Sequence, residues 1–130
     1  MLVEVLPIGN CMDEFDLYVY RVVTYKVIDG DTLDVTLDLG FNTFRKERIR
    51  FARINAPEMK TEAGPISKSH LSDLLANKNI FVQTIKDHKD KYGRYLAEVW
   101  TEEILDKNVI KYKNINDVML SDNSAELYKK

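Results

Sequence analysis

The chain has 130 residues, of which 45% are hydrophobic and 10% aromatic, and its formal net charge is −2. This length predicts one domain, residues 1–130, with enough apolar residues for a core, so the composition excludes a disordered chain. Cys11 is the sole cysteine, which excludes an intrachain disulfide and a cysteine-based metal site. The slightly acidic balance gives no overall attraction to a polyanion.

The N-terminal segment carries no export or membrane signal that we can identify. No apolar run approaches the roughly 20 residues of a membrane-spanning helix, so we expect no membrane association. Residues 1–11 contain no basic residue, and Pro7 and Gly9 interrupt their apolar run, which is unlike a secretory signal. We therefore favour a cytoplasmic location and expect a monomer. Residues 1–15 predict either an additional strand or a loose arm.

The first half of the chain predicts an antiparallel meander of three strands. Residues 18–28 are rich in Tyr and Val, which favours a strand. Asp-Gly-Asp at 29–31 predicts a turn, and residues 32–39 then alternate between apolar and polar residues, as in a half-buried strand. A second turn is expected near Gly40, and a third strand over 44–54.

The second half predicts a helix, two strands and a last helix. Gly64-Pro65 opens a helix to about residue 77, whose expected apolar face is Ile66, Leu71, Leu74 and Leu75. Strands are expected over 80–85 and 95–100, with a short strand suggested at Val109-Ile110 in the otherwise unassigned segment 101–113. The last helix, capped by Asn114 or Asn116, is expected to carry Val118, Met119, Leu120, Ala125 and Leu127. This order predicts a mainly β domain with helices, a five-stranded OB-fold barrel with one helix after strand three and one at the C-terminus.

The stretch 48–58 attracts attention because a basic strand runs into a proline and a carboxylate. Alternation places Arg48, Arg50 and Ala52 on one face of the strand and Arg53 on the other. Pro57 removes a backbone donor and ends the strand. An arginine on the strand and a carboxylate at its exit suit phosphate chemistry.

Four side chains could meet in one site: Asp31, Arg50, Glu58 and Arg94. Phosphodiester hydrolysis needs a cation on the phosphate oxygens, a base that orients water, and donors that stabilise the developing charge. Simpler interpretations exist for each. Asp-Gly-Asp is foremost a hairpin turn, and Arg50 could be a surface residue paired with Glu47 or Asp34. Glu58 could be a plain loop residue, and both histidines are interpreted as structural or exposed.

Three ordered blocks give this constellation a family context. Residues 27–32, 50–58 and 90–97 resemble the staphylococcal nuclease (thermonuclease) family, and 114–120 resembles its last helix start. The resemblance covers roughly residues 18–128. It implies an OB-fold nuclease that hydrolyses DNA and RNA with Ca²⁺ and typically leaves 3′-phosphate ends.

The resemblance also implies residue roles. Arg50 and Arg94 match the family's catalytic arginines, and Glu58 matches the glutamate that acts as base or orients water. The position of Asp31 matches the metal-ligand aspartate. The expected partners are therefore DNA and/or RNA.

Further positions complete the expected site. Asn55 stands where the family often has a second aspartate ligand, and Ala56 where a backbone carbonyl ligates the metal. Lys91 and Tyr92 match residues that contact a nucleotide phosphate. Arg53 replaces a frequent glycine. The Asn55 departure and the acidic net charge leave one alternative open: a nuclease-like OB module that binds nucleic acid or protein without cleaving it.

Overall fold

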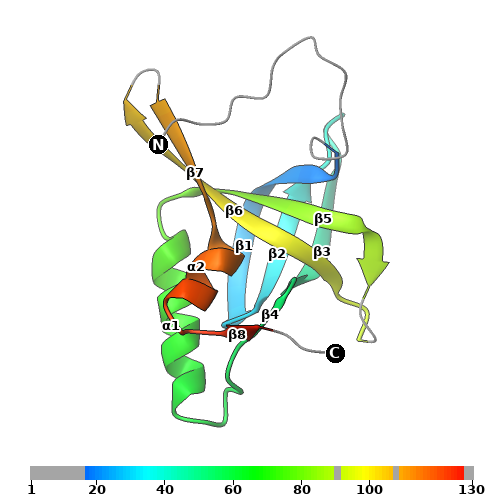
Figure 1. Cartoon of the computed structure of the whole chain (residues 1–130). Helices are drawn as coiled ribbons and strands as arrows, with labels where there is room; N and C mark the ends of the chain where they lie inside the picture. The colour runs from blue at the N-terminus through cyan, green and yellow to red at the C-terminus, as the bar shows by residue number, and fades with distance from the viewer. Residues whose placement is uncertain (1–16, 90–91, 107–108, 128–130) are drawn as a thin grey trace.

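A closed five-stranded barrel forms the centre of the computed structural model, which describes residues 17–89, 92–106 and 109–127 (Figure 1). The strands follow the order β3-β2-β1-β5-β6, and a parallel pairing between β3 and β6 closes the barrel. This confirms the predicted OB-fold. The barrel strands are β1 (Val19–Asp29), β2 (Thr32–Asp38), β3 (Phe44–Phe51), β5 (Asn79–Lys89) and β6 (Tyr95–Asp106).

Five smaller elements complete the described fold. Strand β7 (Val109–Asn114) extends the sheet antiparallel to β6, so the suggested strand at Val109-Ile110 is confirmed and is longer than expected. Strands β4 (Ile54–Asn55) and β8 (Glu126–Leu127) form a two-stranded sheet. Helices α1 (Ala63–Leu75) and α2 (Ile115–Ser121) lie near one end of the barrel (Figure 1).

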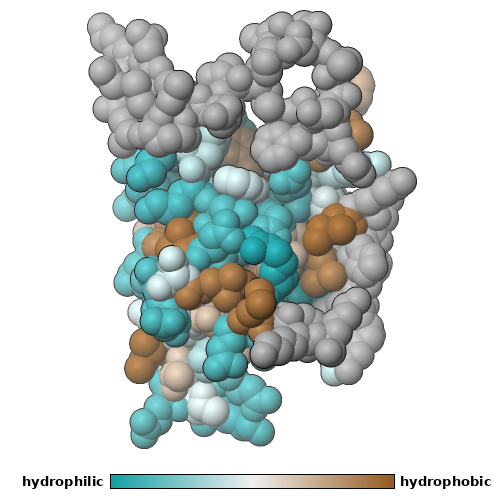
Figure 2. All heavy atoms as spheres, in the orientation of Figure 1, coloured by the Kyte–Doolittle hydropathy of each residue, from teal (hydrophilic) through white to brown (hydrophobic). Residues whose placement is uncertain are grey.

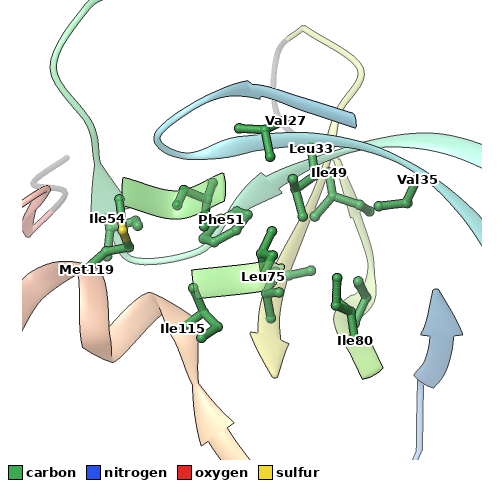
Figure 3. Packing of buried hydrophobic residues seen from close by; sticks show 14 of the residues in the cluster. Val27, Leu33, Val35, Ile49, Phe51, Ile54, Leu75, Ile80, Ile115 and Met119 are labelled. Carbon is green, nitrogen blue, oxygen red and sulfur yellow. The ribbon is translucent and has the colours of Figure 1, made fainter. Parts of the chain in front are cut away.

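The core follows the alternation that the sequence predicts for β2. Leu33, Val35 and Leu37 are buried, while the intervening polar residues are partly exposed. Leu75 of α1 and Met119 of α2 join the same cluster and cover the barrel end (Figure 3). Hydrophobic groups that stay on the surface are scattered among hydrophilic ones on the face shown in Figure 2. In the described part of the chain, no helix is long and apolar enough to cross a membrane.

Two helix predictions need correction. Ile66 does not belong to the buried face of α1 and is 70% exposed; Gly64 and Ser67 are buried instead. The last helix ends at Ser121, so Ala125 and Leu127 lie beyond it. Asn123 has a left-handed φ of 58°, and the backbone N–H of Ala125 donates to the Met119 carbonyl oxygen, which is a helix-ending arrangement.

The third strand is shorter than the sequence suggests. It ends at Phe51, because Arg53 adopts φ +71°, which no strand residue has. Arg53 therefore does not share the inward face with Phe51. It lies on the surface and pairs with Glu98 and Asp117. The turn at 52–53 brings the following segment back toward β2.

Candidate functional site

Asp31 lies at the end of the β1–β2 turn and is 6% exposed. Its Oδ2 atom accepts the backbone N–H of Ala56 at 2.8 Å, and its Oδ1 atom accepts the Thr32 hydroxyl at 2.9 Å. The backbone N–H of Asp31 donates to Asp29 Oδ1 at 3.0 Å. The carboxylate is thus fixed between the turn and the segment that follows β3.

The side chain of Arg50 extends from β3 toward the Asp31 carboxylate, and Arg50 is 8% exposed. Its Nη1 atom donates to the carbonyl oxygens of Phe51 and Ile54 at 2.8 and 2.7 Å, and its Nη2 atom donates to Asn55 Oδ1 at 3.1 Å. The guanidinium lies 3.4 Å from Asp31 Oδ2. Arg50 therefore clamps the turn after β3, and the interpretation as a surface residue is wrong.

The partners suggested for a surface Arg50 are taken by other arginines. Glu47 pairs with Arg45, and Asp34 accepts two hydrogen bonds from Arg48 at 2.6 and 2.9 Å. Arg48 is half exposed, whereas Arg50 is buried two residues further along the strand. The change from exposed to buried marks the rim of the site.

The electrostatics of the site are set by two neighbouring carboxyl groups. Burial, followed by a hydrogen bond with Asp29, raises the pKa of Asp31 to about 6. Burial alone would raise the pKa of Asp29 too, but hydrogen bonds from Asp31 outweigh this effect and lower it. The two groups hence titrate as a pair.

Gly30 permits the close packing that fixes the turn. A Cβ atom at this position would lie 2.1 Å from Ser67 Oγ of α1 and 2.8 Å from the Ala56 Cβ atom. No real Cβ makes such contacts. The turn, helix α1 and Ala56 therefore meet only because residue 30 lacks a side chain.

Glu58 is near this site in the chain but is turned outward. Its carboxylate is 71% exposed and pairs with Lys60 at 3.2 Å. Its carbonyl oxygen accepts hydrogen bonds from the Thr61 N–H at 3.0 Å and the Thr61 hydroxyl at 2.6 Å. The structure fixes the backbone of Glu58 without bringing its carboxylate into contact with Arg50.

Arg94 immediately precedes β6, the strand that pairs with β3. Leu96 is the register partner of Arg50, so Arg94 lies two residues before it. The Arg94 guanidinium stacks on Tyr92 at 5.2 Å from the ring centroid, and the Tyr92 side chain is 71% exposed. The predicted phosphate residue Lys91 lies outside the described residues.

The structure therefore joins one part of the expected site by direct contacts, and the other part makes separate contacts. Asp31, Arg50, Asn55 and Ala56 are joined by direct contacts. Glu58 contacts Lys60, and Arg94 contacts Tyr92.

Asn116 was suggested by the sequence as one of two possible helix caps and as part of a matching block, but in the structure Asn114 is the cap and Asn116 is a buried supporting residue. It is fully buried; its Oδ1 accepts the Val99 N–H at 3.0 Å, and its Nδ2 donates to Ala52 O at 2.9 Å and Ala97 O at 3.1 Å. Asn114 caps the helix through the Asp117 N–H at 3.1 Å. Asn116 thereby fastens α2 to the turn that follows Arg50. Asp29 was also missed, although its spacing from Asp31 signals a carboxylate pair.

The available donors suit a hard cation in type, because they are oxygen atoms of carboxylates, an amide and the backbone. Asp31 and Asn55 supply them from two sides, both in contact with Arg50. Among the described residues there is no cluster of three or more acidic, His or Cys side chains around one point. The donor set thus fits Ca²⁺ in chemistry and is low in charge.

The closed barrel, with a buried carboxylate–arginine pair at its rim, defines an OB-fold domain with a polar site where β2 and β3 meet the following turn. Residues 48–130 match the family model described as Staphylococcal nuclease homologue. The chain belongs to this family. Arg50, Asn55, Glu58 and Arg94 fall inside the matched range, and Asp31 precedes it.

Individual relatives agree with this assignment. The chain is 31% identical over 104 residues to Protein ParB of Escherichia coli, covering 80% of this chain and 55% of that protein. It is 38% identical over 109 residues to an uncharacterized endonuclease of Haemophilus influenzae (84% and 52%). It is 29% identical over 110 residues to a micrococcal nuclease of Shigella flexneri (85% and 59%). The chain spans between half and two thirds of the length of these relatives.

Proposed function

We propose that this domain hydrolyses phosphodiester bonds of DNA and/or RNA with a bound Ca²⁺ ion. The buried Asp31–Arg50 pair carries the proposal. It places a carboxylate and a guanidinium 3.4 Å apart at the rim of a barrel that belongs to a nuclease family. Such a pair offers a carboxylate ligand for a cation and, beside it, a guanidinium that can donate hydrogen bonds to phosphate oxygens.

The ion would be held by the Asp31 carboxylate, the Asn55 amide oxygen and the Ala56 carbonyl oxygen. When bound, Ca²⁺ would neutralise charge on the phosphate and favour attack at phosphorus. The Asn55 oxygen already faces the site, where it accepts the hydrogen bond from Arg50. Asn55 contributes no formal charge, so this site relies on Asp31 and its neighbour Asp29.

The side chains would divide the remaining work. Glu58 orients a water molecule and takes its proton as the new P–O bond forms and the bond to the leaving oxygen breaks. Arg50 and Arg94 donate to the phosphate oxygens and stabilise the charge that develops there. For this, Glu58 turns away from Lys60, which costs little because the pair is largely exposed. Lys91 and Tyr92 bind an adjacent phosphate.

The experiment measures cleavage of single-stranded DNA and RNA by the purified chain with Ca²⁺ and with chelator. Arg50→Ala and Glu58→Ala should each lower the rate about 100-fold or more. Arg45→Ala is the matched control, because Arg45 is an exposed arginine on the same strand. Full activity in Arg50→Ala or Glu58→Ala contradicts the proposal.

One observation favours a second candidate, a non-cleaving module that binds nucleic acid or protein. Both terminal nitrogens of Arg50 are engaged within the protein, and Glu58 faces Lys60. A structural clamp would explain those contacts without catalysis. Binding of oligonucleotide that persists in chelator, with no turnover in any condition, would support this candidate over the first.

A further inference from the structure

A shallow groove of about 440 Å³ crosses β1, β2 and β3, next to the candidate site. Three consecutive residues of each strand line it, at positions 24–26, 34–36 and 46–48. The register of the three strands divides these residues into three rows across the sheet. Val35, in the middle row, is buried in the core. The flanking rows therefore project outward, and they consist of Thr24, Thr36 and Lys46 in one row and Lys26, Asp34 and Arg48 in the other.

One row of side chains on β3 leads from the groove to the buried site. Alternate residues of a strand share a face, so Phe44, Lys46, Arg48 and Arg50 form one row. Phe44 is 53% exposed at the far end, and Arg50 is buried beside Asp31 at the near end. An aromatic ring and three cations thus lead from the surface to the candidate site.

The cations of the groove are not equally committed to protein partners. Arg48 is held by Asp34, and this hydrogen bond keeps the pKa of Asp34 below its ordinary value. Lys46 is exposed, and within the described ranges its side chain has no hydrogen-bond or ion-pair partner. Lys26 adds a further positive charge beside Asp34. Glu47, the other acid of the groove, is paired with Arg45.

We propose that this groove binds a single-stranded segment of nucleic acid, with phosphates at Lys26 and Lys46 and a base stacked on Phe44. The segment then continues along β3 to Arg50. Basic grooves with exposed aromatic rings bind single strands, whose bases are free to stack. The proposal rests on the proposed function, because the end of the path is the site proposed to cleave.

Binding is tested by fluorescence anisotropy with a labelled single-stranded oligothymidylate in chelator, so that the readout does not depend on cleavage. Lys46→Gln should weaken binding several-fold and reduce the slope of log K against log salt by about 0.7, the value for one phosphate contact. Phe44→Ala should weaken binding about tenfold with the slope unchanged. Lys111→Gln on β7, outside the groove, is the matched control and should change neither quantity.

A third variant should strengthen binding. Asp34→Asn removes a negative charge and releases Arg48 toward the phosphates, so affinity should rise about threefold or more. A variant that merely disturbed the sheet would weaken binding instead. Melting temperatures close to that of the wild type confirm that each variant is folded.

The outcomes separate this proposal from the proposed function. A wild-type chain that binds the oligonucleotide with these variant effects but never cleaves it supports the groove and contradicts the nuclease. Cleavage with unchanged binding and unchanged KM in Lys46→Gln, Phe44→Ala and Asp34→Asn overturns the groove alone. Failure of the wild type to bind any single strand also overturns it.

Discussion

The Ala56 N–H donates to Asp31 Oδ2 at 2.8 Å, and this contact ties the β1–β2 turn to the segment that follows β3. The two residues are 25 positions apart in the chain. The same oxygen faces the Arg50 guanidinium. The carboxylate therefore organises two loops around itself before any ligand arrives.

Asp31→Asn should change how stability depends on pH in the presence of chelator. The pKa of Asp31 is about 6 in the folded chain, above its ordinary value of 3.8. A carboxyl group with a raised folded-state pKa favours the fold while it is protonated. Its contribution to stability is complete below about pH 4 and is lost as the pH rises through 6. The free energy of unfolding of the variant should therefore rise relative to that of the wild type between pH 4 and pH 7.

Urea unfolding at several pH values measures this difference. Asp73→Asn on α1 serves as the control, because Asp73 is an exposed acid away from the turn. If the free energies of unfolding of Asp31→Asn and of the wild type differ by the same amount from pH 4 to pH 7, the pKa of Asp31 is not raised by burial.

Asn116→Ala should destabilise the chain strongly. It leaves the Val99 N–H and the Ala52 and Ala97 carbonyl oxygens without their partner in the interior. Each buried unsatisfied group costs about 1–3 kcal/mol, so a loss of about 3–5 kcal/mol is expected.

Asn114→Ala gives the scale for that measurement. It removes the helix cap at the neighbouring asparagine and should cost about 1 kcal/mol in the same denaturation experiment. Equal losses for the two variants would show that Asn116 does not fasten the turn as described.

Arg53→Gly should be more stable than Arg53→Ala by about 1 kcal/mol. Both variants lose the exposed pairs with Glu98 and Asp117, which contribute about 0.2–1 kcal/mol each. Only glycine relieves the cost of φ +71°. Thermal unfolding of both variants measures the order, and the reverse order would mean that the left-handed backbone is not strained.

Gly64→Ala should displace Glu58 and lower cleavage. A Cβ at residue 64 would lie 2.1 Å from the Glu58 carbonyl oxygen, so the loop before α1 has to shift. We expect a destabilisation of about 1–3 kcal/mol from overpacking, together with at least a tenfold loss of cleavage rate.

Gly40→Ala is the control for this variant. Gly40 has φ +82° with open space around it, so alanine there strains the backbone far from Glu58. It should cost about 1 kcal/mol of stability and leave the cleavage rate unchanged. A rate loss in Gly40→Ala as large as in Gly64→Ala would indicate a general effect of lowered stability.

The sequence predicted the strands because their alternation is a local property. Leu33, Val35 and Leu37 needed only the pattern of their neighbours to be assigned to the core. The clamp made by Arg50 could not be predicted in this way. It depends on the left-handed turn at Arg53, which the preceding alternation gave no reason to expect.

The site was predicted as a set of residues but not as an arrangement. Asp31 and Arg50 come together because β2 and β3 are neighbours in register, with Thr32 beside Arg50. The orientation of Glu58 follows instead from the close approach of Gly64 and from Lys60, which are contacts of the folded loop. No periodicity in the sequence encodes such contacts.

The most direct test of the central claim is cleavage of a labelled single-stranded oligonucleotide by the wild-type chain, followed with Ca²⁺ and then with excess chelator. We predict cleavage in Ca²⁺ that stops in chelator and falls about 100-fold or more in Glu58→Ala at the same Ca²⁺ concentration. Absence of cleavage in Ca²⁺, or an equal rate in chelator, would contradict the assignment of this site as a Ca²⁺-dependent nuclease.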